Sequence, residues 1–479
     1  MTSAADWPCC LAGEWRRTGT ELAVRSPWDG RLVGRTWLAG PEALETATRA
    51  AVEAAPGMAR LAAHERAAIL RRVSAALAAS ADDIARTLAA EAGKPLKDAR
   101  TEVDRARLTF SVAADESLRI GGEFLPLDVA PPGERRFAVT RRVPLGPVAG
   151  ISPFNFPLNL VAHKLAPAVA AGDPIVLKPA TRTPLSALTL ARLLVEAGLP
   201  PGGVSVLPLD RRDGDRLVTD DRFRLLTFTG SSAVGWDLKA RAGRKRVVLE
   251  LGGNAGLIVD RDAPVDFAVT RLLAGGFGFA GQSCISVQRV FVHADVFDAF
   301  AAKVVTGAER LVVGDPLDPA TDLGPLITED DAARTEAWVQ EAVAGGATVL
   351  TGGRRLGRAG YAPTVLTGVP AGSRVCAEEA FAPVVVLERV DSFEAAIDAV
   401  NASRYGLQAG VFTRSLPHAL AAFDRLEVGG VIVNDVPSWR IDPMPYGGVK
   451  DSGLGREGPR YAIEDMTELR LLVVNQDPA

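Results

Sequence analysis

The stretch RLLTFTGSSAVGWDLKARAGRKRVVLELGG, residues 224–253, decides the fold of this chain. Its two ends are short apolar runs of the length of buried β-strands, and the segment between them has the length of a helix. A strand, a helix and a second strand in this order predict a βαβ unit with parallel strands. The same alternation begins at residue 143, and a second α/β series follows residue 253. We therefore predict an α/β fold.

Length and composition exclude several classes of protein. The chain has 479 residues, of which 47% are apolar and 23% charged, values that suit a globular protein of two or three domains. A net charge of −4 argues against a nucleic acid as the main partner. The N-terminal residues lack the pattern of a signal peptide, and no apolar stretch is long enough to span a membrane. We expect a cytoplasmic protein without a nucleic-acid or membrane partner.

The chain has four cysteines, Cys9, Cys10, Cys284 and Cys376, and four histidines. Four cysteines in a chain of this length do not form a disulfide framework, and neither residue type is grouped as zinc ligands are. We predict no metal site and expect a reducing compartment. Cys284 lies in GQSCIS (281–286), where small neighbours let other groups approach the sulfur. It is either an inert core residue or, with a lowered pKa, a nucleophile.

The regions outside the parallel series have a different character. Residues 41–118 carry small and apolar side chains at helical spacing, and Pro56 and Pro95 are expected to break this region into separate helices. Residues 119–142 are rich in glycine and proline and end in alternation, as in a β-excursion. The last segment, YAIEDMTELRLLVVNQ (461–476), ends in an apolar strand. Its edge would be exposed unless it is paired, for example with another subunit.

Two segments suggest a nucleotide site. TFTGSSAVG (227–235) is a strand, a turn and the start of a helix, where backbone N–H groups and the helix dipole hold phosphate. The alternative is an ordinary N-cap by Ser231 or Ser232. PIVLKPA (174–180) ends a parallel strand with Lys178, at the edge where open α/β sheets bind ligands. Lys178 is therefore either a ligand of ribose or phosphate, or a solvated lysine.

Two more polar side chains lie in apolar surroundings. Asn155, in ISPFNFPLN (151–159), either bonds the local backbone or donates to a developing oxyanion. Glu250, in LELGG (249–253), interrupts an apolar strand, so burial would raise its pKa and make it a general base near neutral pH. A thiol, an amide donor and a carboxylate base in one chain suit covalent catalysis.

Seven motifs resemble the aldehyde dehydrogenase superfamily, in their order and spacing, over essentially the whole chain. These motifs are PFNFP, LKPA, FTGSSAVG, LELGG, GQSCIS, EEAFAP and PYGGVKDSGLGREG. The resemblance implies an α/β fold of three parts: a Rossmann-like cofactor domain at 1–118 and 143–250, an α/β catalytic domain at 251–440, and a β-arm at 119–142 and 460–479. In that family the arm serves oligomerisation, so a homodimer or a homotetramer is expected.

The resemblance also implies NAD(P)-dependent oxidation of an aldehyde to its carboxylic acid. Cys284 attacks the carbonyl carbon, and Asn155 with the backbone N–H of Cys284 holds the oxyanion. After the hydride has left, Glu250 activates the water that hydrolyses the thioester. The motifs place the cofactor residues at Ser152, Phe154, Lys178, Thr181, Gly230, Ser231, Leu251, Glu379 and Phe381.

Two departures from the family's usual residues bear on the cofactor. Members that prefer NAD often carry glutamate three residues after the lysine of LKPA, whereas this chain has Thr181 followed by Arg182. This pair tolerates a 2′-phosphate, unless Arg182 points to solvent, so we expect the use of NAD or NADP. EEAFAP has Ala382 where the family usually has glycine, which is expected to tighten the nicotinamide end of the site.

The substrate is indicated by a narrower resemblance. Residues 401–413 and 434–453, together with GQSCIS, are most similar to lactaldehyde, phosphonoacetaldehyde and non-phosphorylating glyceraldehyde-3-phosphate dehydrogenases. These enzymes act on short aldehydes that are hydroxylated or anionic. We expect Arg440 and Arg107 to clamp an anionic group, unless they form structural salt bridges, and Phe156 to shape the pocket wall.

Three other functions remain open from the residues. A CoA-acylating aldehyde dehydrogenase would pass the acyl group to CoA, but such members usually lack the glutamate of LELGG, which is Glu250 here. A thioesterase or esterase would use Cys284 without a cofactor. A non-enzymatic binding or structural relative would normally lack the thiol or the base, and this chain has both.

Overall fold

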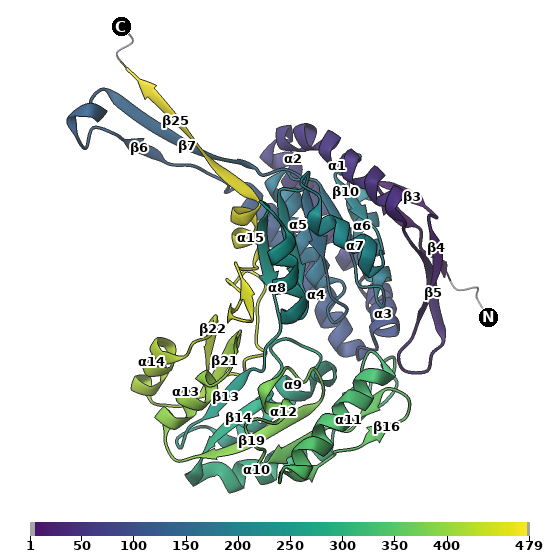
Figure 1. Cartoon of the computed structure of the whole chain (residues 1–479), viewed down its shortest axis with the longest axis vertical. Coiled ribbons are helices and arrows are strands. Elements are labelled where there is room, and N and C mark those ends of the chain that lie inside the picture. Colours follow the sequence, from purple (N-terminus) through teal and green to yellow (C-terminus); the bar gives the residue numbers. More distant parts are fainter. Residues whose placement is uncertain (1–4, 477–479) are drawn as a thin grey trace.

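The computed structural model describes residues 5–476, so the ends of the predicted cofactor domain and arm, 1–4 and 477–479, lie outside the described residues. Figure 1 shows two bodies of helices and strands, from which a thin β-arm projects. One body is built around an eight-stranded sheet and the other around a seven-stranded sheet. The predicted α/β fold is confirmed.

The eight-stranded sheet has the order β24-β12-β11-β8-β9-β10-β2-β3. Its five central strands are parallel, and β24, β2 and β3 are antiparallel additions at the edges. The strands are β2 Cys9–Leu11, β3 Glu14–Arg16, β8 Val148–Ile151, β9 Ile175–Lys178, β10 Val204–Val206, β11 Leu225–Thr229, β12 Arg246–Glu250 and β24 Gly453–Leu454.

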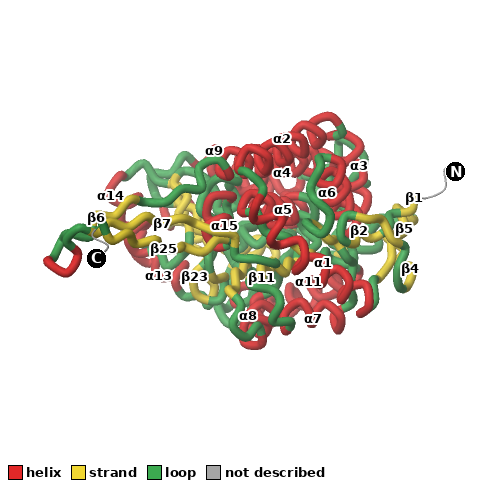
Figure 2. Tube along the Cα trace, turned by 90° about the horizontal axis from the view of Figure 1, so that it is seen from above, coloured by secondary structure: helices red, strands yellow, loops and turns green. Residues whose placement is uncertain are grey.

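Helices cover both faces of this sheet, as Figure 2 shows from above. One face packs against α2 to α6, and the other against α1, α7 and α8. Because side chains alternate along a strand, Ile175 and Leu177 of β9 lie in the first core and Val176 in the second. Burial on both sides explains the uninterrupted apolar runs of the central strands. The helices are α1 Pro41–Arg60, α2 Ala63–Ala79, α3 Ala81–Ala92, α4 Leu96–Ser117, α5 Asn159–Ala171, α6 Pro184–Glu196, α7 Arg211–Thr219 and α8 Ser232–Arg241.

The seven-stranded sheet has the order β15-β18-β19-β14-β13-β21-β22 and is parallel except at β15. Helices α9 and α10 pack on one face and α13 and α14 on the other, while α11 and α12 close a smaller core. The strands are β13 Gly256–Val259, β14 Arg289–His293, β15 Thr348–Thr351, β18 Thr364–Thr367, β19 Val384–Val390, β21 Gln408–Phe412 and β22 Gly430–Val433. The helices are α9 Val265–Phe277, α10 Ala294–Glu309, α11 Glu329–Ala344, α12 Arg374–Ala377, α13 Phe393–Asn401 and α14 Leu416–Arg425.

The arm is a three-stranded sheet of order β25-β7-β6, in which β25 pairs antiparallel with β7 along its whole length. Leu469, Leu471 and Leu472 of β25 are exposed. An edge strand with exposed leucines is the kind of surface that another chain covers. The strands are β6 Phe124–Pro126, β7 Arg136–Pro144 and β25 Thr467–Asn475.

The remaining elements are short. Strands β1, β4 and β5 form a separate sheet near the N-terminus, and the pairs β16–β17 and β20–β23 stand alone. Within residues 5–476, no helix is both long and apolar enough to cross a membrane. These elements are β1 Ala5–Asp6, β4 Thr20–Arg25, β5 Leu32–Leu38, β16 Arg355–Leu356, β17 Gly360–Tyr361, β20 Tyr405–Gly406, β23 Val449–Lys450, α15 Pro459–Asp465 and the 3₁₀ helices η1 Pro131–Gly133 and η2 Gly278–Gly281.

Helix α1 continues through Pro56, so the prediction that Pro56 ends a helix is wrong. Val52, whose carbonyl loses its helical partner at Pro56, is exposed together with Pro56, so water can bond that carbonyl. The predicted break at Pro95 is confirmed. Helix α3 ends before it and α4 begins after it, with Gly93 in the left-handed conformation between them at a φ of 71°.

A buried ion pair lies at the start of α4. The side chains of Lys94 and Glu102 are both fully buried, and they contact each other directly. The second oxygen of Glu102 accepts the backbone N–H groups of Leu158 and Asn159, at 2.9 Å and 3.1 Å. Glu102 therefore caps the N-terminus of α5, where these donors have no partner within the helix.

The ammonium group of Lys94 also joins two loops. Its Nζ lies 3.7 Å from the ring centroid of Phe156, in the loop before α5, and 4.4 Å from that of Phe279, in η2. A cation at these distances attracts the faces of both rings. The ion pair thus fixes the loop between β8 and α5 against the turn that precedes Cys284.

We predict that Lys94→Met lowers the free energy of unfolding by about 3–5 kcal/mol, because it leaves the Glu102 carboxylate buried without its cation. Urea unfolding followed by circular dichroism measures the loss. Lys97→Met is the matched control, since the side chain of Lys97 is 52% exposed and pairs with Asp322 at the surface. A pair of that kind contributes less than about 1 kcal/mol. Equal losses in the two variants would contradict the role given to Lys94.

Candidate functional site

The candidate site lies at the carboxyl edge of the eight-stranded sheet. Strand β8 ends at Ile151, β9 at Lys178 and β12 at Glu250. From β8 the chain adds β9 and β10 on one side, and then β11 and β12 on the other, so the strand order reverses beside β8. Open α/β sheets bind their ligands next to such a reversal.

Cys284 follows a turn with a strained backbone. Phe279 and Ala280 have φ values of 47° and 53°, a left-handed conformation that costs a non-glycine residue about 1–3 kcal/mol. Gly281 shares this conformation at 70°, and a Cβ there would lie 2.1 Å from a backbone oxygen. A Cβ at Gly253 would lie 2.8 Å from the backbone oxygen of Cys284, so glycine in LELGG lets that segment approach the cysteine loop.

The thiol of Cys284 is partly buried, and its Sγ lies 2.9 Å from the hydroxyl oxygen of Tyr446. Burial raises the pKa of Cys284 to about 12, although the hydrogen bond with Tyr446 lowers it. The carboxyl group of Glu379 raises this pKa further, Arg440 lowers it, and Glu250 raises it. The sulfur is therefore protonated at neutral pH in this environment.

Asn155 lies in the loop between β8 and α5 and is 3% exposed. Its Nδ2 donates to the backbone oxygen of Gln282 at 3.0 Å, and its Oδ1 has no hydrogen-bond partner among residues 5–476. The sequence left open a bond from Asn155 to the local backbone. The bond in the structure goes instead to the loop that carries Cys284. Because an amide nitrogen carries two N–H groups, the second can donate to an oxyanion formed beside the thiol.

Glu250 is 4% exposed, and neither of its carboxyl oxygens has a hydrogen-bond partner within the described part of the chain. Burial, and then the carboxylate of Glu457, raise the pKa of Glu250 well above its ordinary value. Arg440, Lys164 and Arg456 oppose this rise. A carboxyl group that titrates above its usual range suits a general base near neutral pH.

A network of buried charges adjoins Glu250. Nζ of Lys164 lies 4.0 Å from Glu457, and Glu457 accepts a hydrogen bond from Arg440 at 3.0 Å. The same guanidinium lies 3.2 Å from Nε2 of His163, which lies 2.8 Å from Asp442. Burial alone would raise the pKa values of Glu457 and Asp442, but the neighbouring imidazole and cations hold both below their ordinary values.

Arg107 is not part of this network, so the structure does not support its expected role as a substrate clamp. Its side chain is 46% exposed and pairs with Asp104. Arg105 donates to both oxygens of Asp442, at 3.2 Å and 2.8 Å, and its guanidinium lies 5.6 Å from the ring of Phe156. Residues two apart on a helix face different sides, so Arg105, and not Arg107, faces the network.

The motifs contained other residues of this network that sequence reasoning missed. Tyr446 and Glu457 lie in PYGGVKDSGLGREG, and Arg440 stacks 3.7 Å above the ring of Tyr446. Lys164 is a charged residue in the otherwise apolar segment NLVAHKLAPAVAAG, which is a signal of a buried functional group. Its Nζ donates to hydroxyl groups on β11 at 3.1 Å and 2.8 Å.

A cavity of about 600 Å³ opens at the ends of β9 and β11. Lys178 and Thr181 line it, as do Arg211 and Arg241. Burial lowers the pKa of Lys178, and a Cβ at Gly214 would lie 2.7 Å from its side chain, so glycine in α7 makes room for the lysine. Three carboxylates also line it, Asp210, Asp215 and Asp237, and Arg241 pairs with the last two. The apolar walls, with Lys178 and Arg211 beside them, fit the adenosine end of a dinucleotide.

Polar groups without partners follow β8 and β11, which both end at this cavity. The hydroxyl groups of Ser152 and Ser232 are buried without hydrogen-bond partners among the described residues. Ser231 occupies the N-cap position of α8, but its side chain makes no capping bond. Unoccupied donors at a helix N-terminus fit a pyrophosphate better than the alternative of an ordinary N-cap. A Cβ at Gly230 would lie 2.5 Å from an aromatic ring, so glycine is required at this turn.

Glu379, Phe154 and Phe381 are three more of the residues predicted for the cofactor. Glu379 accepts the backbone N–H of Gly253 at 3.1 Å, and a Cβ at Gly252 would lie 2.2 Å from its carboxyl group. Burial raises the pKa of Glu379 to about 7. Phe381, at a φ of 50°, meets Phe154 edge to face with ring centroids 5.8 Å apart. Glu379 thus contacts the LELGG segment, whereas Lys178 and Thr181 line the cavity, and both placements fit NAD(P).

The side chains of two residues considered for the cofactor do not line the cavity. The side chain of Leu251 is 2% exposed and packs against Gly235 of α8, so it belongs to the core. Arg182 is exposed and does not line the cavity, which agrees with the alternative that it points to solvent. A 2′-phosphate bound in the cavity would instead meet the cations that line it, Lys178, Arg211 and Arg241.

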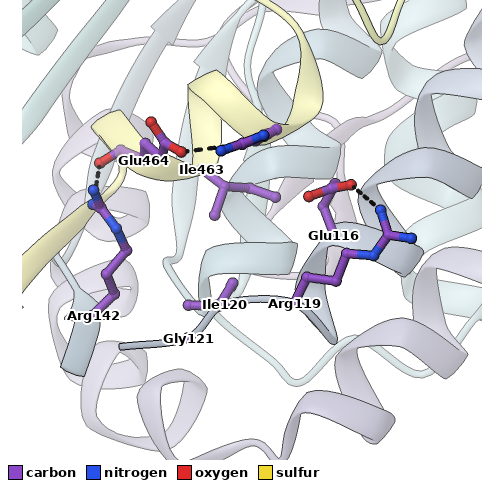
Figure 3. A pocket seen from close by; sticks show the side chains of 8 residues that line it. Glu116, Arg119, Ile120, Gly121, Arg142, Ile463 and Glu464 are labelled. Carbon is purple, nitrogen blue, oxygen red and sulfur yellow. Dashed lines mark hydrogen bonds and ion pairs between the residues drawn. The ribbon is translucent and has the colours of Figure 1, made fainter. Parts of the chain in front are cut away.

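Another cavity, of about 290 Å³, lies at the root of the arm (Figure 3). Its charged side chains already have partners: Arg119 pairs with Glu116, and Arg142 and Arg460 bond Glu464. This cavity contains none of the predicted site residues. No cluster of three or more His, Cys, Asp or Glu side chains within residues 5–476 could hold a metal ion.

Comparison with known proteins identifies the family. The sequence pattern of the aldehyde dehydrogenase family matches residues 15–472. The 3-sulfolactaldehyde dehydrogenase of Priestia aryabhattai is 43% identical over 476 residues, which are 99% of this chain and 99% of that protein. Among solved structures, aldehyde dehydrogenase 21 from Physcomitrella patens, in complex with the reaction product succinate, has a TM-score of 0.97 and 47% identity, with 99% of each chain covered.

A second structure concerns the cofactor. The glyceraldehyde-3-phosphate dehydrogenase GapN from Methanocaldococcus jannaschii, complexed with NADP, has a TM-score of 0.91 and 37% identity, covering 95% of this chain and 99% of that one. These likenesses agree with the branch that the sequence indicated. The chain belongs to the aldehyde dehydrogenase family and is an NAD(P)-dependent oxidoreductase.

Proposed function

We propose that this protein oxidises a short aldehyde with an anionic group, hydroxylated or not, to its carboxylic acid. The charge of the buried network that adjoins Glu250 carries this proposal. The buried network holds three cations but two carboxylates with lowered pKa values, and Glu250 adds no charge while it is protonated. The cations are Arg105, Arg440 and Lys164, and the carboxylates are Asp442 and Glu457. The excess positive charge favours an anionic substrate.

The similar proteins support the same substrate class. The relative from Priestia is named for sulfolactaldehyde, an aldehyde that carries a hydroxyl and a sulfonate group. The structure of aldehyde dehydrogenase 21 contains the reaction product succinate. Oxidation of an aldehyde forms one of its two carboxylates, so the other was already present in the substrate. An arginine is well suited to such groups, because its planar fork bonds carboxylates and sulfonates in pairs.

The proposed reaction begins when Sγ of Cys284 attacks the carbonyl carbon. The oxyanion accepts hydrogen bonds from Asn155 and from the backbone N–H of Cys284. When bound, the nicotinamide cofactor supplies the hydride acceptor, with Lys178 and Thr181 at its adenosine end. Glu250 then takes a proton from water, whose oxygen attacks the resulting thioester, and the C–S bond breaks to release the acid.

The proposal extends to assembly and location. The exposed leucines of β25 support a homodimer or a homotetramer formed through the arm. We assign domains by the sheets: the eight-stranded sheet to 1–118 and 143–250, the seven-stranded sheet to 251–440, and the arm to 119–142 and 460–479. Strand β24, Gly453–Leu454, joins the eight-stranded sheet from outside these ranges. The four free cysteines suit a reducing compartment such as the cytoplasm.

Short aldehydes with and without an anionic tail, assayed by NAD(P)H formation, test the substrate class. We predict that kcat/KM for the anionic aldehyde falls about 10- to 100-fold in Arg105→Met, because a hydrogen bond to a charged group is lost. The neutral aldehyde should change little. Arg107→Met is the matched control and should keep the preference. Equal effects of both variants would refute the clamp, and NAD(P)H formation by Cys284→Ala would refute the nucleophile.

We predict that Glu250→Gln accumulates an acyl-enzyme on Cys284, which mass spectrometry of the quenched enzyme detects. The pKa of Glu250 is raised, so the carboxylate that acts as base becomes more abundant as pH rises. Hydrolysis by the native enzyme should therefore speed up with pH through this pKa, and the variant should lack that rise. Unchanged steady-state turnover in Glu250→Gln would rule out the base role.

We predict that Thr181→Glu lowers the ratio of kcat/KM for NADP to that for NAD by about tenfold or more. The new carboxylate would repel a 2′-phosphate in the cavity that Thr181 lines, at a cost of at least about 1.4 kcal/mol. Thr181→Gln has the same size without the charge and should change the ratio less. If both variants behave alike, Thr181 does not face the 2′ position.

A further inference from the structure

We propose that Tyr446 is a further catalytic residue, whose phenol O–H donates to the sulfur of Cys284 and stabilises the thiolate that attacks the aldehyde. The inference rests on the proposed role of Cys284 as the nucleophile. It adds a group that increases the small fraction of thiolate present at neutral pH.

Tyr446 is held rigidly in place for this bond. Its hydroxyl oxygen lies 2.9 Å from Sγ of Cys284, and the residue is 2% exposed. Its backbone N–H donates to the oxygen of Glu457 at 3.1 Å, and its own carbonyl accepts the N–H of Glu457 at 2.6 Å. The ring packs with Ile285 and Leu407. A donor fixed by backbone and packing needs little rearrangement when the sulfur becomes charged.

Arg440 strengthens the donor. Its guanidinium lies 3.7 Å from the ring centroid of Tyr446, and Glu457 and His163 hold it from the other side at 3.0 Å and 3.2 Å. A cation over the face of a phenol draws electron density from the ring, so the O–H becomes a better donor. Arg440 thus acts on the sulfur through Tyr446 as well as through its field.

Either group can donate while Cys284 is a thiol, but a thiolate has no proton to donate, so the phenol is the donor once the sulfur is charged. Burial raises the pKa of Tyr446 well above its ordinary value, so the phenol keeps its proton. The S–H proton of Cys284 leaves to solvent water instead, and the phenol O–H donates to the thiolate. The other charged groups that face the sulfur are Glu379 and Glu250, which raise its pKa, and Arg440, which lowers it.

Such a bond speeds attack only if it raises the fraction of thiolate more than it lowers the nucleophilicity of each thiolate. A hydrogen bond to a charged group lowers the pKa of a thiol by about one to two units. Each unit raises the thiolate fraction at neutral pH about tenfold and lowers the nucleophilicity of each thiolate about threefold. The net gain is about threefold for each unit.

Alkylation of Cys284 by iodoacetamide, followed against pH by mass spectrometry of its peptide, tests the proposal. In Tyr446→Phe the midpoint should rise by about one unit or more, and alkylation at neutral pH should slow about threefold. Tyr361→Phe is the matched control, because Tyr361 is buried and its hydroxyl has no partner among the described residues. This variant should leave both quantities unchanged.

An unchanged midpoint in a folded Tyr446→Phe variant would overturn the proposal. Thermal unfolding and fluorescence titration with NADP establish whether the variant is folded. If it is not, replacement of Tyr446 by a ring-fluorinated tyrosine tests the same bond, since its O–H is a stronger donor. The midpoint must then fall, and a midpoint that stays or rises refutes the role.

The test is independent of the proposed substrate. Alkylation needs no aldehyde, so a failure of the substrate panel leaves the result for Tyr446 interpretable. Conversely, an unchanged alkylation profile would remove the role of Tyr446 and leave aldehyde oxidation by Cys284 intact.

Discussion

The buried ion pair between Lys94 and Glu102 is the constraint on which the site depends. Glu102 caps α5 and so fixes the loop that carries Asn155, while Lys94 packs against one aromatic ring of that loop and one of the turn before Cys284. One pair of charges therefore sets the position of the amide relative to the thiol. Because desolvation of two buried ions offsets most of their attraction, the pair contributes geometry more than stability.

Burial keeps the reacting groups of the site uncharged until the reaction begins. It raises the pKa values of Cys284, Glu250 and Glu379, so these groups are neutral or easily protonated before the reaction begins. A permanent cation, Arg440, faces Cys284 and Glu250, because a guanidinium keeps its charge even when buried. New negative charge then appears in a low-dielectric site whose donors are already oriented, where each interaction is stronger than in water.

The sequence predicted the sheets, because burial on both faces leaves short apolar runs such as 175–177 and 247–249. It could not predict the orientation of α4: Arg105 and Arg107 look alike until the helix is docked. In the sequence, Lys94 looks like part of a helix break. Its role is visible only in the fold, because its partners Glu102, Phe156 and Phe279 come from three separate segments. Pro56 does not end the helix, because water can bond the carbonyl of Val52, which loses its helical partner. The exposure of that carbonyl is known only from the folded structure.

Arg440 serves two tasks that compete. An anionic substrate group that pairs with Arg440 cancels part of the field that favours the thiolate of Cys284. The hydrogen bond from Tyr446 acts over a short distance and does not depend on the net charge nearby, so it persists when the substrate is bound. Arg105, which Asp442 holds at a separate place in the network, offers the substrate a second cation. In the proposed reaction Arg440 would therefore act mainly on the sulfur, and Arg105 would bind the anionic group.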